Sequence, residues 1–307
     1  MKAMMNRRDF TKVGLAALGA ASLPAFAAAH KPKLKIGCTC ITWGTFPPKP
    51  GKPDETLEPA LKDIYTEGFW GFETFPEDLD DWSARGALQP LMKRYPVPLK
   101  SGYITANVID PAQRKSEIDR LVRLTKTVKN LGGTFMVMAT NGVKRDSYNF
   151  QEHQANIVAS LNDYAKAVND TGLKTGLHQH TGTAIETRDE VYAVMHAVDT
   201  NHMKFAPDVG QLQKGGADAA QVVKDFLPLV SHMHLKDYKG WQYYSGYCPL
   251  GMGQVDVRGI LDMVESAHQN PDIMVELDPS ADGPMTPLQT LQTSKAYLQK
   301  LGYKFRT

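Results

Sequence analysis

The sequence predicts an α/β protein with a single (β/α)8 barrel, the TIM-barrel architecture. Three observations predict it: eight short apolar runs alternate with longer helical patterns, residues 30–307 offer the length of one barrel, and no glycine-rich phosphate loop follows the first strand. Strict alternation is typical of a parallel sheet, and eight repeats of this size suit a closed barrel. The competing fold, an open doubly wound sheet, is disfavoured because such a loop is its usual signature.

Each predicted strand is a short apolar run bounded by turn residues. The eight strands are expected over residues 34–41, 69–73, 98–105, 134–139, 174–178, 204–208, 229–235 and 273–277. Helical spacing of apolar residues, or a helix-start signal, marks helices near residues 57–65, 111–128, 157–168, 187–196, 218–226, 257–267 and 287–301. Thr187 and Glu190 form a capping box, and Asp110-Pro111 is a cap followed by proline at the first helical position.

The first 29 residues predict a cleavable twin-arginine (Tat) signal peptide. Arg7 and Arg8 stand together, followed by a short, mildly apolar stretch over 13–23 and then by small residues. The stretch is too short and too rich in alanine and glycine to span a bilayer stably. A degenerate anchor or a disordered tail is the alternative. We therefore expect a mature domain over residues 30–307, the periplasm as its location and the Tat export machinery as a partner.

Composition excludes several classes of protein. A net charge of +2 over 307 residues gives no basic stripe, so nucleic acid is not an expected partner. No segment after the signal is long and apolar enough for stable membrane insertion. The three cysteines fit no disulfide framework, and Cys38 and Cys40 are expected to be buried as small hydrophobes. A homo-oligomer is compatible with this composition.

Ionisable side chains stand at the predicted carboxyl ends of five strands. They are Glu73, then His178 and His180, Asp208, His232 and His234, and finally Glu276 and Asp278. Because side chains alternate along a strand, the two members of each pair share a face, and carboxyl ends of barrel strands surround one site. Each residue alone could be structural. Together they predict a site for one divalent metal ion (Mn²⁺, Co²⁺, Zn²⁺ or Mg²⁺), because mixed nitrogen and oxygen ligands without thiolate suit these ions.

Other features permit two interpretations each. Trp43 and the aromatic run Trp241 to Tyr247 could stack on a sugar or pack their own loops. Lys236 could polarise a substrate oxygen or neutralise a neighbouring carboxylate. Gly251-Met252-Gly253 is too short a glycine pattern to indicate phosphate binding.

Four segments come in the order and spacing of a known superfamily. They are Asp208-Val209-Gly210-Gln211, His232-Met233-His234-Leu235-Lys236-Asp237, Gly251-Met252-Gly253-Gln254-Val255-Asp256 and Val275-Glu276-Leu277-Asp278-Pro279. Over residues 33–303 the chain resembles the sugar phosphate isomerase/epimerase family, the xylose isomerase-like TIM barrels. With His-x-His-x-Gly-Thr at His178 to Thr183, it is closest in motif to the inosose dehydratases.

The resemblance implies a metal held by four side chains: His178, Asp208, His234 and Glu276. The family usually has glutamate at the first position, in a Glu-x-His pattern, so either His178 or His180 is the first ligand here. Gln211 stands where the family often has histidine. The candidate catalytic residues are Glu276, His180 and Lys236, and the candidate substrate-binding residues are Glu73, Trp43, Gln211 and His232.

The function that the resemblance implies is a metal-dependent sugar isomerase or epimerase. It would remove a proton next to a carbonyl of a small carbohydrate and proceed through an enediolate, with Glu276 or a histidine as the base. A lyase on the same scaffold is the alternative, either a dehydratase of a keto-inositol or an eliminating lyase on a 3-keto-glycoside. A non-catalytic periplasmic sugar-binding protein is the third hypothesis.

Overall fold

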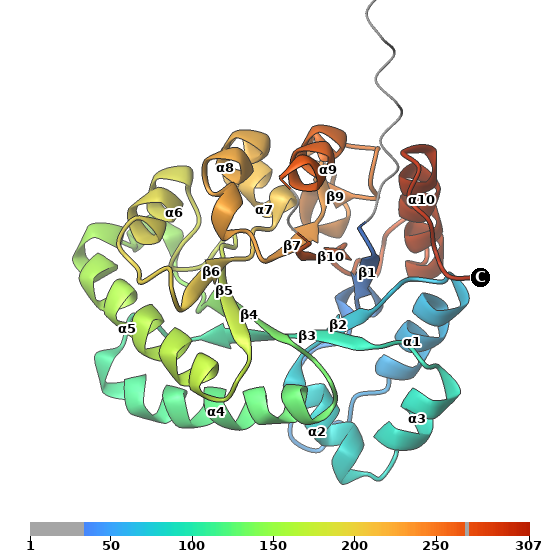
Figure 1. Ribbon diagram of the computed structural model, residues 1–307, viewed down its shortest axis with the longest axis horizontal. Coiled ribbons are helices and arrows are strands. Elements are labelled where there is room, and N and C mark those ends of the chain that lie inside the picture. The colour runs from blue at the N-terminus through green and yellow to red at the C-terminus, as the bar shows by residue number, and fades with distance from the viewer. Residues whose placement is uncertain (1–33, 268–269) are drawn as a thin grey trace, which may run out of the picture. The chain divides into compact units, whose positions relative to one another are not determined.

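The computed structural model describes residues 34–267 and 270–307, and the predicted signal peptide lies outside them. Within the described residues, eight parallel strands form one sheet (Figure 1). In chain order they are β1 (Ile36–Thr39), β2 (Phe72–Thr74), β3 (Leu99–Ala106), β4 (Phe135–Thr140), β5 (Lys174–His178), β6 (Met203–Phe205), β7 (His232–Leu235) and β10 (Asp272–Val275). Their order in the sheet, β6-β5-β4-β3-β2-β1-β10-β7, follows the chain except for the short hairpin β8–β9.

The two ends of this sheet meet and close the barrel. The amide of Ser231 donates to the carbonyl of Phe205 at 3.0 Å, and the amide of His234 donates to the carbonyl of Pro207 at 2.9 Å. Parallel bridges pair Phe205 with Val230 and Asp208 with His234. The predicted single (β/α)8 barrel is therefore confirmed.

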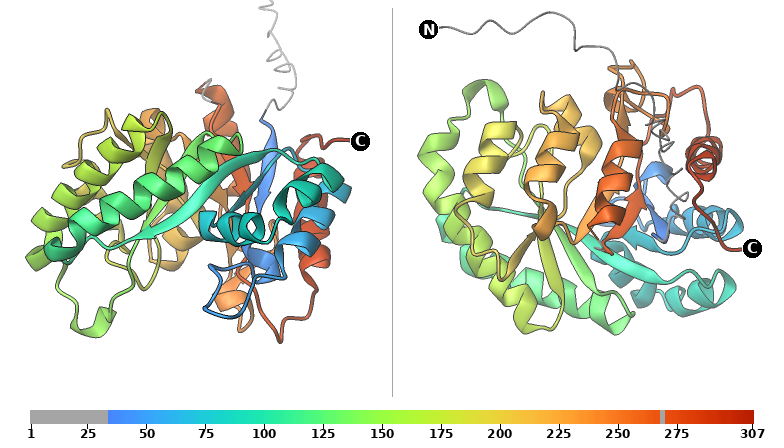
Figure 2. Two further views of the ribbon diagram at one scale, coloured as in Figure 1. Left: turned by 90° about the horizontal axis from the view of Figure 1, so that it is seen from below. Right: turned by 45° about the horizontal axis from the view of Figure 1, so that its top comes forward.

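Helices surround the strands, as the second view in Figure 2 makes plain. They are α1 (Leu57–Thr66), α2 (Pro76–Ala84), α3 (Leu88–Arg94), α4 (Arg114–Asn130), α5 (Phe150–Asp170), α6 (Arg188–Met195), α7 (Val209–Lys214), α8 (Ala219–Asp225), α9 (Val257–Ser266) and α10 (Pro287–Lys300). The capping box at Thr187 and Glu190 starts α6 as predicted. Helices α2, α3 and α7 were not predicted from the sequence, because they are short and carry few apolar residues. None of the described helices reaches the length and apolarity that a membrane span requires.

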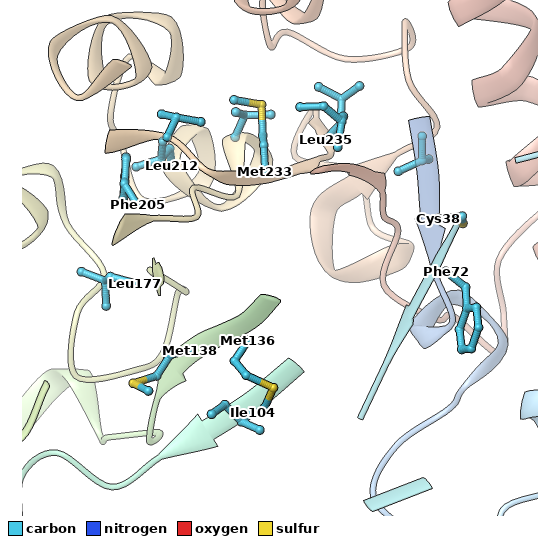
Figure 3. Close-up of a cluster of buried hydrophobic side chains, with 14 of the residues drawn as sticks. Cys38, Phe72, Ile104, Met136, Met138, Leu177, Phe205, Leu212, Met233 and Leu235 are labelled. Atoms are coloured by element: carbon cyan, nitrogen blue, oxygen red, sulfur yellow. The ribbon is translucent and has the colours of Figure 1, made fainter. Parts of the chain in front are cut away.

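Alternating side chains on each strand build two apolar layers. On β4, Met136 and Met138 join the large cluster packed with the helices, part of which Figure 3 displays, whereas Phe135 and Val137 belong to a small cluster with Ala206. The period of two along a strand directs these residues to opposite faces of the sheet. The small cluster fills the barrel interior, so polar side chains nearer the strands' carboxyl ends rest on an apolar floor.

The loop after β7 contains a feature that the sequence analysis treated as a plain aromatic loop. It forms the hairpin β8 (Asp237–Tyr238) and β9 (Tyr247–Cys248). Asp237 accepts hydrogen bonds from the amides of Gly251 at 3.0 Å, Gly253 at 2.9 Å and Val255 at 3.1 Å. A Cβ on residue 253 would lie 2.2 Å from the Asp237 carboxylate. The glycine pattern is therefore explained by this close approach.

Two buried carboxyl groups lie where the segment before α1 meets α2. Asp54 accepts hydrogen bonds from Trp82 Nε1 at 2.8 Å and from the amide of Leu57 at 3.1 Å. Asp78 accepts from Thr74 Oγ1 at 3.0 Å with one oxygen, while its other oxygen has no hydrogen-bond partner among the described residues. Burial, followed by the neighbouring charge of Asp54, raises the pKa of Asp78 to about 8.

We expect Asp78→Asn to stabilise the fold at pH 8 by about 1 kcal/mol or more beyond its effect at pH 5. The folded protein keeps a proton on Asp78 that the unfolded chain releases above pH 4, so wild-type stability falls as the pH rises from about 4 towards 8. Asparagine does not titrate and removes this loss. Urea unfolding at the two pH values measures it, with Asp119→Asn on the exposed face of α4 as the control. Equal effects of Asp78→Asn at both pH values would contradict the prediction.

Candidate metal centre

Side chains from the last four barrel strands meet at one point inside the barrel. Ligand atoms of His178, Asp208 and His234 lie within 4.8 Å of one another. Glu276 Oε2 lies 3.0 Å from His234 Nδ1. All four side chains are buried. The four residues that the resemblance implied as metal ligands are therefore neighbours.

Local structure explains how each side chain reaches this centre. His178 is the last residue of β5, and His234 lies within β7. Asp208 is the N-cap of α7, where its Oδ1 accepts the amides of Gly210 and Gln211, both at 2.9 Å. A capping aspartate uses one carboxylate oxygen for the helix and keeps the other for a second partner. Asp208 can therefore cap α7 with Oδ1 and still direct Oδ2 towards the cluster.

One buried atom in this cluster lacks a partner, and two others have only charged neighbours. Within the part of the chain that the structure describes, His178 Nε2 makes no hydrogen bond, whereas Asp208 Oδ2 lies 3.2 Å from Lys236 Nζ and His234 Nδ1 lies 3.0 Å from Glu276 Oε2. Buried polar atoms are nearly always hydrogen-bonded, so the unpaired imidazole nitrogen of His178, aimed at this cluster, calls for a partner. Imidazole nitrogen and carboxylate oxygen are ligands of Zn²⁺, Mn²⁺ and Co²⁺. The residues fit one divalent ion, which these three and Glu276 would hold.

The two histidines of the ligand set differ in their pKa values: His178 is ready to ligate, whereas His234 would have to give up its Nδ1 proton to a metal ion. Burial, and then the charge of His234, hold the pKa of His178 well below its usual value, so its imidazole is neutral, as a metal ligand must be. Burial opposes a charge on His234, but the carboxylates of Glu276 and Glu73 keep its pKa well above the usual value. Burial likewise opposes ionisation of Glu276, yet His234 and Lys236 hold its pKa well below the usual value.

Lys236 is a fully buried cation beside the cluster. Its Nζ lies 3.2 Å from Asp208 Oδ2, 2.7 Å from Glu276 Oε1 and 2.7 Å from Asp278 Oδ1. Burial lowers its pKa, but Asp208, Asp278 and Glu276 raise it well above the usual value. Of the two predicted roles, this geometry matches neutralisation of carboxylates. Asp278 was not among the predicted site residues, although its sharing a face with Glu276 was a signal for it.

Glu73 lies beneath the cluster and holds two histidines. Its Oε1 is 2.7 Å from His234 Nε2, and its Oε2 is 3.0 Å from His232 Nε2 and also accepts from Ser101 Oγ. With the Nε2 side of His234 directed at Glu73, Nδ1 is the ring nitrogen that faces the centre, where Glu276 Oε2 lies 3.0 Å away. A carboxylate behind a ligating histidine commonly fixes the ring in this way. Burial would raise the pKa of Glu73, but the two histidines hold it well below its usual value.

This arrangement changes the role expected of Glu73 and His232. Both were predicted to bind substrate, yet the exposed fractions of their side chains are 1% and 0%. His232 stacks on Phe135 of the apolar floor, with ring centroids 5.2 Å apart. Their contacts are those of positioning residues. Ser101 was missed, because only the register of β2 against β3 brings it opposite Glu73.

His180 and Gln211 form a closed hydrogen-bond network at the edge of the site. Gln211 Oε1 accepts from the amide of Thr181 at 3.1 Å and from its hydroxyl at 2.8 Å, so the Gln211 amide nitrogen faces His180 Nε2 at 2.7 Å. His180 Nδ1 lies 2.7 Å from the Thr181 carbonyl and therefore carries the proton. Because both ring nitrogens are engaged, His178 rather than His180 faces the metal cluster. Gln211, predicted to bind substrate, is buried and orients His180.

A small cavity adjoins the cluster on the side of the strands' carboxyl ends. It measures about 30 Å³ and is lined by Thr39, Ile41, Glu73, Thr74, Phe75, Tyr103, His180 and Glu276. Its volume suits one water molecule or one substrate oxygen. Tyr103 was not predicted from the sequence. The centroid of its ring lies 5.3 Å from that of His178 and 6.0 Å from that of His234. A larger cavity of about 520 Å³, near Lys174 and Ser231, lies at the opposite end of the strands, the end that carries no active site in such barrels.

Comparison with known proteins decides the family. Residues 59–301 match the model of the xylose isomerase-like TIM barrel. The chain belongs to the xylose isomerase-like TIM barrel family. Among its relatives, an inosose dehydratase of Clostridium botulinum is 24% identical over 222 residues, which are 67% of this chain and 72% of that protein.

Solved structures share the fold of this xylose isomerase-like barrel. A zinc-bound IOLI protein superposes with a TM-score of 0.70 at 15% identity, covering 89% of this chain and 100% of that one. The 3-keto-D-glucoside 4-epimerase of E. coli has a TM-score of 0.65 at 16% identity, covering 88% and 99%. The relatives and neighbours with these names are enzymes, one of them solved with a metal ion.

We expect Glu73→Gln to weaken divalent-metal binding to this xylose isomerase-like barrel by about 10–100-fold. The neutral amide no longer holds His234 by a charged hydrogen bond, so the ring loses its fixed orientation. Calorimetric titration with Zn²⁺ and Mn²⁺ measures the affinity. Glu58→Gln is the matched control, because Glu58 forms an exposed ion pair with Arg94 on the outside of the barrel. Unchanged affinity in a folded Glu73→Gln protein would refute the positioning role.

Proposed function

We propose that this protein is a divalent-metal-dependent isomerase that removes a proton next to a carbonyl of a small carbohydrate. One observation carries the proposal: Glu276 contacts His234 in the ligand cluster and also lines the adjoining cavity. A bound divalent ion would supply a Lewis acid that stabilises negative charge on a sugar oxygen as the proton leaves. The fold analogy and the named relatives support the carbohydrate as substrate class.

The residues around the cavity divide the remaining work. Glu276 is the base, since His234 and Lys236 keep its carboxylate ionised and able to accept a proton. Lys236 keeps the neighbouring carboxylates neutralised without entering the cavity. Tyr103 and Phe75 form an apolar wall that excludes water from the reacting atoms. His180 is held at the rim by Gln211 and lines the cavity, where its ring can contact a substrate hydroxyl.

The number of candidate general bases at the site favours a reaction on one face of the sugar. His178 stands where the family usually has a second glutamate, which leaves Glu276 as the one glutamate of the ligand set. A single base removes a proton and returns it on the same side, which supports isomerisation between adjacent carbons over epimerisation by two opposed bases. Elimination is the second candidate, a dehydration of a keto-inositol or loss of an aglycone from a 3-keto-glycoside. The similarity to an inosose dehydratase favours it.

We expect Glu276→Gln to lower the rate of substrate deuterium exchange by about 10²–10⁴-fold, the usual contribution of a general base. The assay incubates Mn²⁺-loaded protein with ketoses, aldoses, an inosose and a 3-keto-glucoside in D₂O, followed by NMR and mass spectrometry. Glu58→Gln is the matched control, because Glu58 forms an exposed ion pair with Arg94 on the outside of the barrel. Metal affinity is measured for both variants, so that loss of the ion is separated from loss of the base.

The products of this assay distinguish the candidates. Deuterium incorporation with conserved mass supports isomerisation, and loss of water or of an aglycone supports elimination. Sugar binding without exchange under any of the four divalent ions would overturn both and favour a binding protein. Full exchange by metal-loaded Glu276→Gln would remove Glu276 as the base.

We also propose that the protein is exported in folded form by the Tat machinery to the periplasm. The pattern at Arg7 and Arg8 supports this proposal. Folding before export would let the site take its metal in the cytoplasm, where competition from Cu²⁺ and Zn²⁺ differs. Replacing both arginines by lysine is expected to retain the protein in the cytoplasm, which cell fractionation measures. Lys12→Arg is the control, and undiminished export of the twin-lysine protein would contradict the pathway.

A further inference from the structure

A second, larger cavity lies on the same face of the barrel as the metal cluster. It is a groove of about 510 Å³ whose walls include Thr42, Trp43, Tyr244, Pro279, Ser280 and Met285. Trp43 ends the short 3-10 helix that follows β1, and Met285 belongs to the loop between β10 and α10. We call it the Trp43 groove. Its walls therefore come from loops at the carboxyl ends of the strands, where ligands of such barrels bind.

The sizes of the two cavities assign them different tasks. The cavity at Glu276 measures about 30 Å³, which is too small for a sugar ring, whereas the Trp43 groove, at about 510 Å³, lies in the range of small-molecule sites. The small cavity has room only for the reacting atoms. Most of the binding surface for a substrate must therefore lie outside it.

The two cavities are next to each other along two segments of the chain. Ile41 lines the small cavity, and Thr42 and Trp43 line the groove. Glu276 lines the small cavity, and Pro279, three residues later, lines the groove, which limits their separation to about 10 Å. A hydrogen bond of 2.8 Å from Thr42 Oγ1 to the Leu277 carbonyl joins the segments into a ridge between the cavities. A molecule made of two joined rings could place one ring in each cavity, on either side of this ridge.

One wall of the groove has a strained backbone and is fixed by hydrogen bonds. Tyr244 and the following Ser245 have left-handed backbones, with φ of 51° and 56°, a conformation that non-glycine residues rarely adopt. The Tyr244 hydroxyl donates to the Met285 carbonyl at 2.9 Å and accepts from the Met285 amide at 3.0 Å. Strain that the surroundings maintain is characteristic of ligand-binding segments, and a preformed wall lowers the entropic cost of binding.

The lining of the groove selects a neutral ligand. Among the described residues, no charged side chain lines it. It lies at the start of α10, where the reciprocal capping box uses the amides of Thr286 and Gln289 and Pro287 has no amide proton, which leaves few donors for an anion. Trp43 is held by a 2.9 Å hydrogen bond from its Nε1 to Asp63 Oδ2 and contributes an aromatic surface. Aromatic faces with neutral hydroxyl and amide groups around them suit uncharged rings.

We propose that the Trp43 groove binds the second ring of a glycoside substrate, an aryl aglycone or a second sugar, while the first sugar reacts at Glu276. The inference rests on the proposed function and gives its substrate class: a glycoside whose reacting ring carries a keto group, rather than a free monosaccharide. The chain would hold the non-reacting ring on a rigid wall and so position the reacting one. Binding energy from such a remote ring is a general means of placing the reacting atoms.

Ligand binding without turnover tests the groove separately from the chemistry. Phenyl β-D-glucoside, cellobiose and methyl β-D-glucoside are titrated into wild-type protein and followed by calorimetry and by saturation-transfer NMR. We expect phenyl β-D-glucoside or cellobiose to bind about tenfold more tightly than methyl β-D-glucoside. The ligand that does so identifies the second ring as an aromatic group or as a sugar.

Two variants test whether the tenfold gain in affinity comes from the Trp43 groove. Trp43→Ala is expected to abolish the tenfold preference and to leave Mn²⁺ affinity unchanged. Trp70→Ala is the matched control, because Trp70 precedes β2 at the opposite end of the strands and bonds the Lys304 carbonyl. Should Trp43→Ala disturb folding, Ala281→Trp fills the groove from its exposed rim without removing a contact and is expected to have the same effect on binding.

Equal affinities of wild-type protein for the three ligands would overturn the proposal. So would a preference that survives in both Trp43→Ala and Ala281→Trp. A preference that depends on the groove, in a protein that exchanges no substrate proton, would refute the proposed isomerase and leave the groove as a glycoside-binding site.

Discussion

The site depends on the imidazole of His234, which is held between two carboxylates. Glu73 lies 2.7 Å from its Nε2 and Glu276 lies 3.0 Å from its Nδ1. The three residues belong to β2, to β7 and to the end of β10, so the contact exists only when the sheet closes in the correct register. Every ring atom that could bind a metal is thereby oriented before an ion arrives, which is the condition for a tight and specific site.

The apolar floor gives these charges their strength. Phe135, Val137 and Ala206 fill the barrel beneath the histidines, and Tyr103 lies beside them. Electrostatic interactions are strong in such surroundings because little water screens them, and an uncompensated charge is correspondingly costly. Burial raises the pKa of Asp208 even though Lys236 contacts it. The cluster thus has more carboxyl groups than fixed cations, and a divalent ion relieves that excess.

Much of this site could be predicted from sequence, because it depends on local rules. Alternation along β7 correctly directs His232 and His234 to one face, and the capping preference of aspartate identifies Asp208 as the start of a helix. The same rule failed for His180: β5 ends at His178, so the alternation ends there too, and Gln211 then holds His180 at the rim. Local sequence rules cannot predict the residues that hold these candidate ligands in place. Glu73 meets His234 across 161 residues of sequence, and only the tertiary register of strands decides that contact.

Lys236 explains how such a site can exist in a folded protein without its ion. Its ammonium contacts Asp208, Glu276 and Asp278, three carboxyl groups that would otherwise repel one another inside the barrel. Many metal sites form only when the ion is present, because their ligands cannot be brought together without it. Here a built-in cation holds the carboxylates in place, and the closed barrel holds Lys236. The contacts of Lys236 with the three carboxyl groups would therefore hold the candidate ligands near one another before a metal ion binds.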